Sequence, residues 1–221
     1  MPIDSTQEAK KMRWYFDFIS PYAYLQSTKL YQFSELQSVE CVPVLFAGLL
    51  NHWQNIGPAE IDPKRQWTFR NCLWLAQRDK IEFKLPACHP FNPLPLLRLS
   101  IVHNNSVAVV QRLFNFVWAE GHLPQNTAAF AELLDELNTR PEELDTVEVK
   151  QDLQQNGRLA IKRGVFGVPS VEYQGDVIWG YEASDMVIAA LQAEKQFTSR
   201  KFADADTLPQ GIKRKAKSNL G

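Results

Sequence analysis

Near its amino end the chain carries a short aromatic stretch that runs straight into a helix start. Residues 12–19 read MRWYFDFI, a pattern typical of a buried strand. Ser20 and Pro21 follow, and serine is a favoured N-cap while proline is favoured at the first helical position. We therefore predict a strand, a helix from residue 21 to about 37, and a second strand over 40–46. In such a strand–helix–strand unit, Ser20 lies where the strand ends and the helix begins.

The rest of the chain is helical until strand signal returns near its carboxyl end. Helical periodicity dominates from residue 47 to about 162. Two short apolar runs then flank Gln174-Gly175-Asp176, a composition typical of a hairpin. The expected parts are a discontinuous α/β domain over 12–46 and 164–196, a helical insertion domain over 47–163, and a mobile tail over 197–221.

The charge balance and the cysteine count exclude several classes of protein. With 24 basic and 25 acidic residues, the formal net charge is -1, so we expect neither nucleic acid nor an anionic membrane as a partner. No stretch approaches the roughly 18 apolar residues of a membrane span. Residues 1–11 are polar and lack the apolar core of a secretory signal. Cys41, Cys72 and Cys88 are odd in number and lack CxxC spacing, so we expect a reduced, cytoplasmic protein without a metal site.

Ser20 is the first candidate for chemistry. A helix N-terminus exposes unpaired N–H groups and a partial positive charge, and both stabilise an anion. A thiol bound there would have its pKa lowered from about 8.5, and each unit needs about 1.4 kcal/mol of preference for the thiolate. Residue 20 carries a hydroxyl and no sulfur, so a thiol at this position would come from another molecule, and Ser20 would donate a hydrogen bond to it. The alternative is that Ser20 only caps the helix.

Val168-Pro169 is the second candidate, and it lies just before the predicted hairpin. An X–Pro bond is cis in only about 5% of cases. A cis bond here would turn the N–H and carbonyl of Val168 outward beside the start of the first helix, where an extended peptide could pair with them. Each feature alone is weak evidence, but together they indicate one binding site.

The layout of these two features resembles the thioredoxin superfamily. The chain resembles the 2-hydroxychromene-2-carboxylate isomerase family, a DsbA-like family that also holds the kappa-class glutathione transferases. The resemblance implies a thioredoxin-like α/β fold with a large all-helical insertion, glutathione as cofactor, a small-molecule substrate, and a homodimer as a family-level expectation. The matching stretches are YFDFISPYAYL at 15–25, NIGP at 55–58, HPFNPLPLLRL at 89–99, VFGVPS at 165–170 and GDVIWGYE at 175–182.

The resemblance also implies roles for single residues. Ser20 matches the catalytic serine that activates the glutathione thiol. His89 falls near a substrate-facing tyrosine of the isomerase and is a candidate substrate contact, with a structural role between prolines as the alternative. For Asn55 the alternative is a loop amide that satisfies the local backbone. The residues implied in glutathione binding are Ser20, Asn55, Val168, Pro169, Trp179, Gly180, Tyr181 and Glu182.

Two departures from the family pattern bear on the ligand. The γ-glutamyl segment of the family usually reads Gly-x-Asp-Arg, whereas residues 180–183 read Gly-Tyr-Glu-Ala, which keeps the negative charge and lacks the arginine. Leu50 and Asn51 lie where the isomerase has a substrate-side lysine, so an aromatic carboxylate would lose a cation. We interpret the tryptophans of the predicted helices as core residues and not as ligand contacts: Trp67, Trp74 and Trp118.

By resemblance, we expect a glutathione-dependent isomerase. A glutathione thiolate at Ser20 would add to a conjugated carbon, rotation would follow, and elimination would return the thiol. Two alternatives stay open: a kappa-like glutathione S-transferase that releases the adduct, and a non-catalytic binding protein, for which the altered Glu182-Ala183 segment is the main support. A protein-disulfide oxidoreductase of the DsbA type is not expected, because position 20 has no sulfur and position 23 is alanine.

Overall fold

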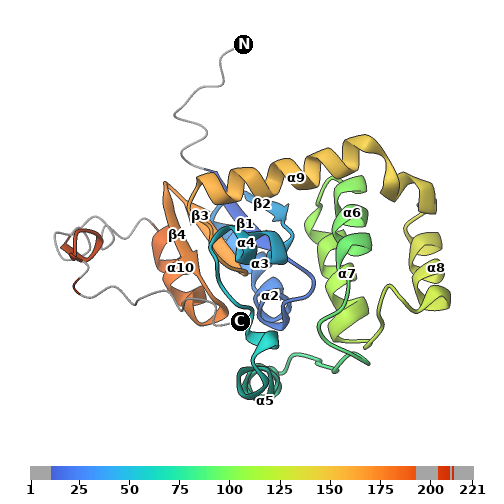
Figure 1. The fold of residues 1–221 in the computed structure, drawn as a ribbon, viewed down its shortest axis with the longest axis horizontal. Coiled ribbons are helices and arrows are strands. Elements are labelled where there is room, and N and C mark those ends of the chain that lie inside the picture. Colours follow the sequence, from blue (N-terminus) through green and yellow to red (C-terminus); the bar gives the residue numbers. More distant parts are fainter. Residues whose placement is uncertain (1–10, 193–203, 210, 212–221) are drawn as a thin grey trace, which may run out of the picture.

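A computed structural model of the chain describes residues 11–192, 204–209 and 211. It contains a four-stranded sheet in the order β2-β1-β3-β4 with helices on both sides (Figure 1). β1 pairs in parallel with β2 and antiparallel with β3, and β3 pairs antiparallel with β4. The predicted thioredoxin-like fold with a helical insertion is therefore confirmed. The strands are β1 (Met12–Phe16), β2 (Val39–Pro43), β3 (Ser170–Tyr173) and β4 (Asp176–Trp179).

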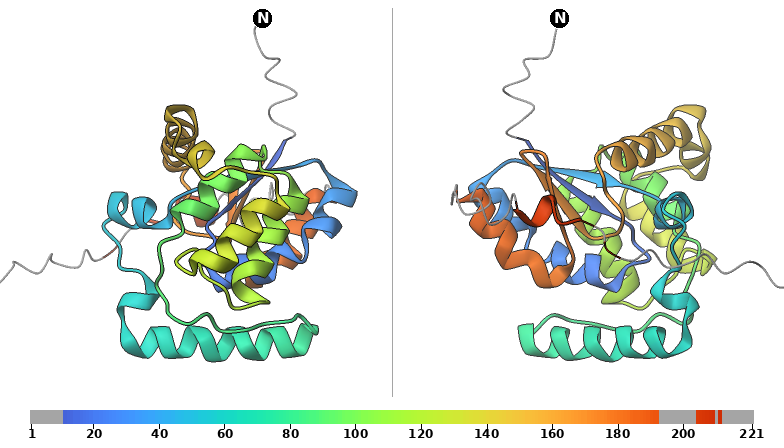
Figure 2. Two further views of the ribbon diagram at one scale, coloured as in Figure 1. Left: turned by 90° about the vertical axis from the view of Figure 1, so that its right-hand side faces the viewer. Right: turned by 60° about the vertical axis from the view of Figure 1, so that its left-hand side comes forward.

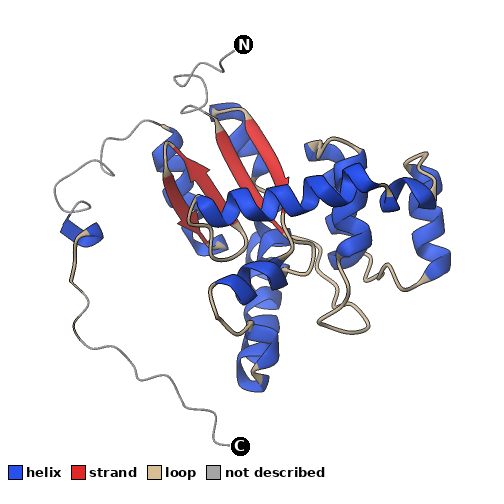
Figure 3. Ribbon diagram, turned by 45° about the horizontal axis from the view of Figure 1, so that its top comes forward, coloured by secondary structure: helices blue, strands red, loops and turns tan. Residues whose placement is uncertain are grey.

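The helices fall into two groups along the chain. Those next to the strands in sequence are α2 (Pro21–Ser27), α3 (Leu30–Leu36) and α10 (Ser184–Leu191). Those between β2 and β3 are α4 (Phe46–His52), α5 (Asp62–Asp79), α6 (Leu94–Val102), α7 (Val107–Trp118), α8 (Thr127–Glu136) and α9 (Val147–Lys162). Three short 3-10 turns are η1 (Pro58–Glu60), η2 (Pro141–Asp145) and η3 (Tyr181–Ala183). Figure 3 shows the strands enclosed by these helices.

β1 is the central strand, and all five of its residues are buried. Alternate side chains of a strand point to opposite faces, so both faces of β1 must be covered. Trp14 and Phe16 stack with their ring centroids 4.7 Å apart and join the large core formed with α2, α3, α7 and α10. Tyr15 points to the other face, into a smaller core with Leu49 of α4 and Ala160 of α9.

Two helices of the predicted insertion pack directly on the sheet. α4 and α9 lie inside the predicted insertion of 47–163, yet they cover one face of the sheet. α5 lies farther from the sheet and runs along the lower edge of the molecule in both views of Figure 2. The predicted tail over 197–221 lies outside the described residues, apart from 204–209 and 211.

The helix predicted from residue 21 to 37 is wrong in one respect, because it is two helices. The Ser27 hydroxyl donates to the Tyr24 carbonyl at 2.6 Å, and the Thr28 hydroxyl donates to the Leu25 carbonyl at 2.8 Å. Such side-chain bonds compete with backbone N–H groups for the carbonyls of the last turn. α2 therefore ends at Ser27, and Lys29 lies in the turn before α3.

Two further properties agree with the composition. Among the described helices, none is long and apolar enough to cross a bilayer. Cys41 and Cys72 are buried and Cys88 is exposed, and all three are free thiols.

Candidate active site

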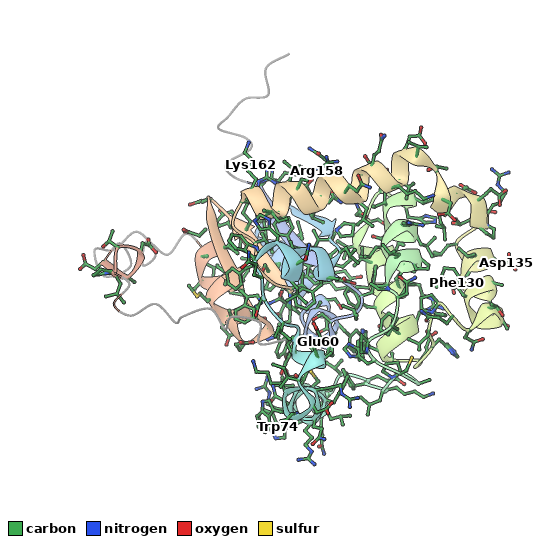
Figure 4. The ribbon with its side chains drawn as sticks, in the orientation of Figure 1. Glu60, Trp74, Phe130, Asp135, Arg158 and Lys162 are labelled. Atoms are coloured by element: carbon green, nitrogen blue, oxygen red, sulfur yellow. The ribbon has the colours of Figure 1, made fainter. Side chains whose placement is uncertain are left out.

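A cleft of about 920 Å³ lies where several elements meet. It is lined by the loop after β1, the starts of α2 and α4, the end of β4 and residues of α5. Glu60, labelled in Figure 4, lines it next to α5. Ser20, Val168 and Pro169 all line this cleft, so the structure brings together the two features that the sequence singled out.

Ser20 is 8% exposed and caps α2 from an extended conformation. Its Oγ accepts a hydrogen bond from the Ala23 N–H at 3.2 Å. Its own N–H donates to the Asp17 carbonyl at 3.1 Å, which fixes the backbone before the helix. The hydroxyl acts only as an acceptor toward the residues that the structure describes, so its proton can be donated to a group in the cleft.

The peptide bond between Val168 and Pro169 is cis. Within residues 11–192, neither the N–H nor the carbonyl of Val168 has a hydrogen-bond partner. The Pro169 carbonyl, in contrast, accepts from the Gly180 N–H at 3.0 Å and ties this loop to the end of β4. The Val168 backbone is thus held at the cleft with both polar groups available to a ligand.

The segment that follows β4 forms one end of the cleft. Trp179, Gly180, Tyr181 and Glu182 all line it, as the resemblance implied. The buried amide of Gln26 fixes the segment: its Nε2 donates to the Gly180 carbonyl at 3.0 Å and to the Ser184 hydroxyl at 3.1 Å. Its Oε1 accepts from the Trp14 indole N–H at 2.8 Å. A core strand therefore holds the end of the cleft in place through one side chain of α2.

Tyr181 connects this segment to α5. It is only 3% exposed, and its hydroxyl donates to Asp79 Oδ2 at the end of α5. Arg78 binds both oxygens of Asp79 at 2.7 Å, and this contact is the main reason why the pKa of Asp79 is lowered to about 2. Burial is the main cause of the raised pKa of Tyr181. The phenol therefore stays protonated and keeps donating to a carboxylate that stays charged.

His89 lines the cleft near Ser20, and the sequence did not predict the hydrogen bond that its ring makes. Its Nε2 is 2.9 Å from the Ile19 carbonyl, and because a carbonyl can only accept, Nε2 carries the ring proton. Its Nδ1 is buried and has no partner among the described residues. Burial lowers the pKa of His89, so the ring is neutral. This geometry agrees with the structural alternative, while a substrate contact stays a prediction.

Asp17 is a residue of the site that sequence reasoning missed. It is fully buried, and its two oxygens accept from the Ile19 N–H at 3.1 Å and from the Phe46 N–H at 2.8 Å. Burial outweighs these hydrogen bonds and raises its pKa from 3.8 to about 7. The side chain joins the loop before Ser20 to the first residue of α4. The signal was present in the sequence, since Asp17 interrupts an otherwise apolar stretch.

Two expectations differ from the structure. Asn55 is exposed and does not line the cleft, and its Oδ1 accepts from the Ile56 N–H at 2.9 Å, which is the loop role weighed as its alternative. The core interpretation holds for Trp118, which is fully buried, and is wrong for Trp67 and Trp74, which are 66% and 57% exposed. The buried residues of α5 are Cys72, Leu75 and Ala76, and the exposed Trp67 lines the cleft.

Comparison with known proteins agrees with this geometry. Glutathione S-transferase kappa 2 of Caenorhabditis elegans is 29% identical over 178 residues, which is 72% of this chain and 79% of that protein. A 2-hydroxychromene-2-carboxylate isomerase structure superposes with a TM-score of 0.71 at 24% identity, covering 88% of this chain and 98% of that chain. The cytosolic disulfide reductase DsbM of Pseudomonas aeruginosa, solved with GSH, superposes with a TM-score of 0.57 at 16% identity, covering 83% and 98%.

At these identities the two solved structures show the fold alone. The family model carries more weight, because the DsbA-like thioredoxin domain matches residues 11–192. That range contains the whole sheet and every residue of the cleft. The chain therefore belongs to the family of DsbA-like thioredoxin domains.

Proposed function

We propose that this protein is a glutathione-dependent enzyme that presents the glutathione thiolate at Ser20 to a conjugated, aromatic-derived substrate. One observation carries the proposal: Ser20 lines the same cleft as Val168, whose backbone N–H and carbonyl have no partner within residues 11–192. The names of the relatives support the choice of thiol, since one is a kappa glutathione transferase and another was solved with GSH.

The two features have complementary roles. The cysteinyl backbone of glutathione would pair with the N–H and carbonyl of Val168, in the manner of an added strand. The sulfur would then lie near Ser20, whose hydroxyl proton has no other acceptor among the described residues. A hydrogen bond to a charged group contributes about 1.5–3 kcal/mol, which lowers a thiol pKa by about one to two units. That is enough to ionise a useful fraction of the thiol at neutral pH.

The thiolate would act as a covalent catalyst in an isomerase. Its sulfur forms a bond to the β-carbon of an unsaturated carbonyl compound, and the electron pair of the double bond moves to the carbonyl oxygen. The former double bond can now rotate. Return of the electron pair breaks the carbon–sulfur bond, re-forms the double bond and releases the thiolate. Glutathione is therefore a cofactor and is not consumed.

A transferase is the second candidate, and two observations favour it. The relative found by sequence is a kappa glutathione transferase. Leu50 lines the cleft at the place where the isomerase family has a substrate-side lysine, so the wall there is apolar. In a transferase the thiolate displaces a leaving group such as chloride, and the conjugate is the product. Both functions use the same thiolate at Ser20.

Ser20→Ala tests what the two functions share. We expect glutathione-dependent turnover to fall by tenfold or more, while the lost cap reduces the free energy of unfolding by about 1 kcal/mol. Thr146→Ala is the matched control, because Thr146 caps α9 through its hydroxyl and is not among the residues that line the cleft. Full activity in Ser20→Ala would contradict the proposal.

The choice between isomerase and transferase needs two substrates. A cis-configured aromatic enone is offered with a trace of glutathione, and 1-chloro-2,4-dinitrobenzene is offered with an excess. Isomerisation without loss of glutathione identifies the isomerase, and stoichiometric conjugation alone identifies the transferase. If the wild-type protein binds no glutathione at millimolar concentration in calorimetry, the glutathione-dependent function is wrong.

A further inference from the structure

One face of α5 carries two exposed tryptophans with an arginine between them. Trp67, Arg70 and Trp74 are spaced by three and four residues, so they lie on the same face of the helix. All three are exposed, Trp67 at 66% and Trp74 at 57%. The buried residues of the helix, among them Cys72 and Ala76, lie on the other face. We call Trp67, Arg70 and Trp74 the outer stripe of α5.

The outer stripe lies at the edge of the molecule. α5 has 18 residues and runs along the lower edge in both views of Figure 2. A helix of this length extends over about 27 Å. Trp74 lies at the lower edge in Figure 4, at the end of the molecule opposite to Arg158 and Lys162 of α9. A flat surface that approaches this edge therefore meets the stripe first.

An open groove of about 510 Å³ lies beside the stripe. Arg70 and Trp74 line it, together with Leu73 of α5 and with Ile81 and Phe83 from the segment that follows the helix. The groove thus combines apolar side chains with a guanidinium. A phospholipid offers the matching groups, since its phosphate is an acceptor for a guanidinium and its acyl chains are apolar.

The charge of this part of the chain differs from that of the whole. Residues 62–85 hold six basic and three acidic side chains, whereas the formal net charge of the chain is -1. Two of the three acids pair with arginines of the same segment, which leaves Glu82. The balance of the whole chain therefore hides a local excess of positive charge. The exposed basic residues of the segment that form no ion pair with any described residue are Lys64, Arg70, Lys80 and Lys84.

This chemistry fits the surface of an anionic bilayer. Tryptophan is enriched at membrane interfaces because its ring is apolar while its indole N–H is polar. Basic side chains beside it are attracted to anionic headgroups. The guanidinium carbon of Arg78 lies 5.3 Å from the centre of the Trp74 ring, which places one more cation at the stripe. A second copy of the chain fits less well, because a twofold interface would bring the same excess of positive charge together.

We propose that the outer stripe of α5 and the groove beside it dock the protein on membranes that contain anionic phospholipids. Arg70 binds a lipid phosphate, and the rings of Trp67 and Trp74 insert between the headgroups. The contact is peripheral and reversible, because only side chains enter the interface. Trp67 also lines the cleft, so a bound bilayer lies beside it and gives it access to apolar compounds dissolved in the lipid. The inference goes beyond the proposed function and does not depend on glutathione.

Sedimentation with sucrose-loaded vesicles measures the binding. We expect the wild-type protein to bind vesicles of phosphatidylcholine with about 30 mol% phosphatidylglycerol at least about tenfold more tightly than vesicles of phosphatidylcholine alone. Added salt should weaken this binding. Arg70→Gln should weaken it about fivefold and Trp74→Ala about tenfold. Neither residue lines the cleft.

The controls remove the same groups elsewhere. Arg158→Gln removes an exposed guanidinium from α9, and Tyr31→Ala removes a ring that is 61% exposed on α3. Neither variant should change the binding to vesicles. Equal losses in Arg70→Gln and Arg158→Gln would overturn the role of the stripe, since the attraction would then belong to the protein as a whole. Circular dichroism checks that each variant keeps the fold.

Quenching by phosphatidylcholine that is brominated on its acyl chains locates the contact. Trp74→Phe keeps an apolar ring, so we expect it to keep most of its binding to anionic vesicles and to show less quenching of tryptophan fluorescence than the wild type. Trp53→Phe is the control, because Trp53 is exposed just after α4, and it should not reduce the quenching. Unchanged quenching in Trp74→Phe would contradict the proposed contact.

Other occupants of the stripe give other results. If sedimentation equilibrium shows a dimer that Trp74→Ala converts to a monomer, and the wild-type protein does not bind the vesicles, the stripe is an interface between copies of this chain and the proposal is wrong. Absence of binding by a monomeric wild-type protein at low salt also overturns it. Equal binding to neutral and anionic vesicles would show that the positive charge has no part in docking.

Discussion

The imidazole of His89 donates a hydrogen bond from Nε2 to the carbonyl oxygen of Ile19, at 2.9 Å, and so contacts the peptide bond that leads into Ser20. His89 comes from the loop between α5 and α6, whereas Ile19 follows β1. The helical insertion therefore supports the loop that positions the candidate catalytic serine. His89 is a positioning residue in this arrangement, held among the rings of Phe69, Phe91 and Trp118.

Replacing His89 should separate its hydrogen bond from its packing. We expect His89→Leu to lower the free energy of unfolding by about 1–3 kcal/mol, because the Ile19 carbonyl loses its donor. His89→Gln keeps an N–H donor and should recover part of that loss. Urea denaturation measures both values. Equal losses in the two variants would show that ring packing, and not the hydrogen bond to Ile19, carries the effect.

Asp17 should make the free energy of unfolding fall as the pH rises. Its pKa is raised from 3.8 to about 7 in the folded state, so the folded protein keeps a proton that the unfolded chain releases. The free energy of unfolding should therefore fall between about pH 4 and pH 7, by at most ~4 kcal/mol, and this slope should be absent in Asp17→Asn. Urea denaturation across this pH range checks the difference between the two proteins.

The comparison with Asp17→Asn is needed because His89 also titrates in this pH range. Its pKa is lowered by burial, so below its unfolded value of about 6.5 the unfolded chain binds the extra proton, and stability rises with pH. The two groups therefore act in opposite directions. Subtracting the Asp17→Asn profile from the wild-type profile removes the contribution of His89. A difference that does not change with pH would contradict the raised pKa of Asp17.

Gly167→Ala should disturb the cleft without unfolding the protein. A Cβ at this position would lie 2.7 Å from Nε1 of Trp179, so the indole must move. Trp179 is 50% exposed and lines the cleft, which lets it move at little cost to the core.

We expect glutathione binding to Gly167→Ala to weaken several-fold in calorimetry. Gly157→Ala is the control, since nothing lies within 4 Å of its Cβ, and in the interior of α9 it should stabilise by about 0.5–1 kcal/mol. Unchanged binding in Gly167→Ala would mean that Trp179 does not contact the ligand.

Tyr181→Phe should loosen the connection between η3 and the end of α5. The variant removes the hydroxyl that donates to Asp79 and keeps the ring under Lys29. We expect faster amide hydrogen exchange near Asp79, measured by mass spectrometry, and a fall of about 1 kcal/mol in the free energy of unfolding. Tyr31→Phe is the control because Tyr31 is largely exposed. Identical exchange in the two variants would show that the Asp79 contact does not hold α5.

The fold could be predicted because its determinants are local. Ser20-Pro21 begins α2, and the hairpin turns at Gln174-Gly175, where φ is 53° and 95°. A turn composition and an alternating apolar pattern are read from neighbouring residues alone. The break after Ser27 was missed because the hydroxyls of Ser27 and Thr28 fit a helix equally well until their acceptors are known.

Much of the site could not be predicted, because its contacts join distant segments. Tyr181 meets Asp79, and His89 meets Ile19, only once α5 and its following loop have folded against the sheet domain. Lys29 has no motif around it, and its place over the Tyr181 ring is visible only in the structure. Residues that the family resemblance named were found at the cleft, with Asn55 as the exception.

The order of pairing in the sheet has a consequence for synthesis on the ribosome. Trp14 of β1 pairs with Cys41 of β2 on one side and with Val171 of β3 on the other. At about 5–20 residues per second, synthesis of the residues between Pro43 and Ser170 takes about 6–25 seconds, during which the second edge of β1 is uncovered. Such an edge can pair with strands of other chains, so the nascent chain is open to wrong pairing during that interval. The cleft around Ser20 is completed only when residues 168–182 have emerged from the exit tunnel.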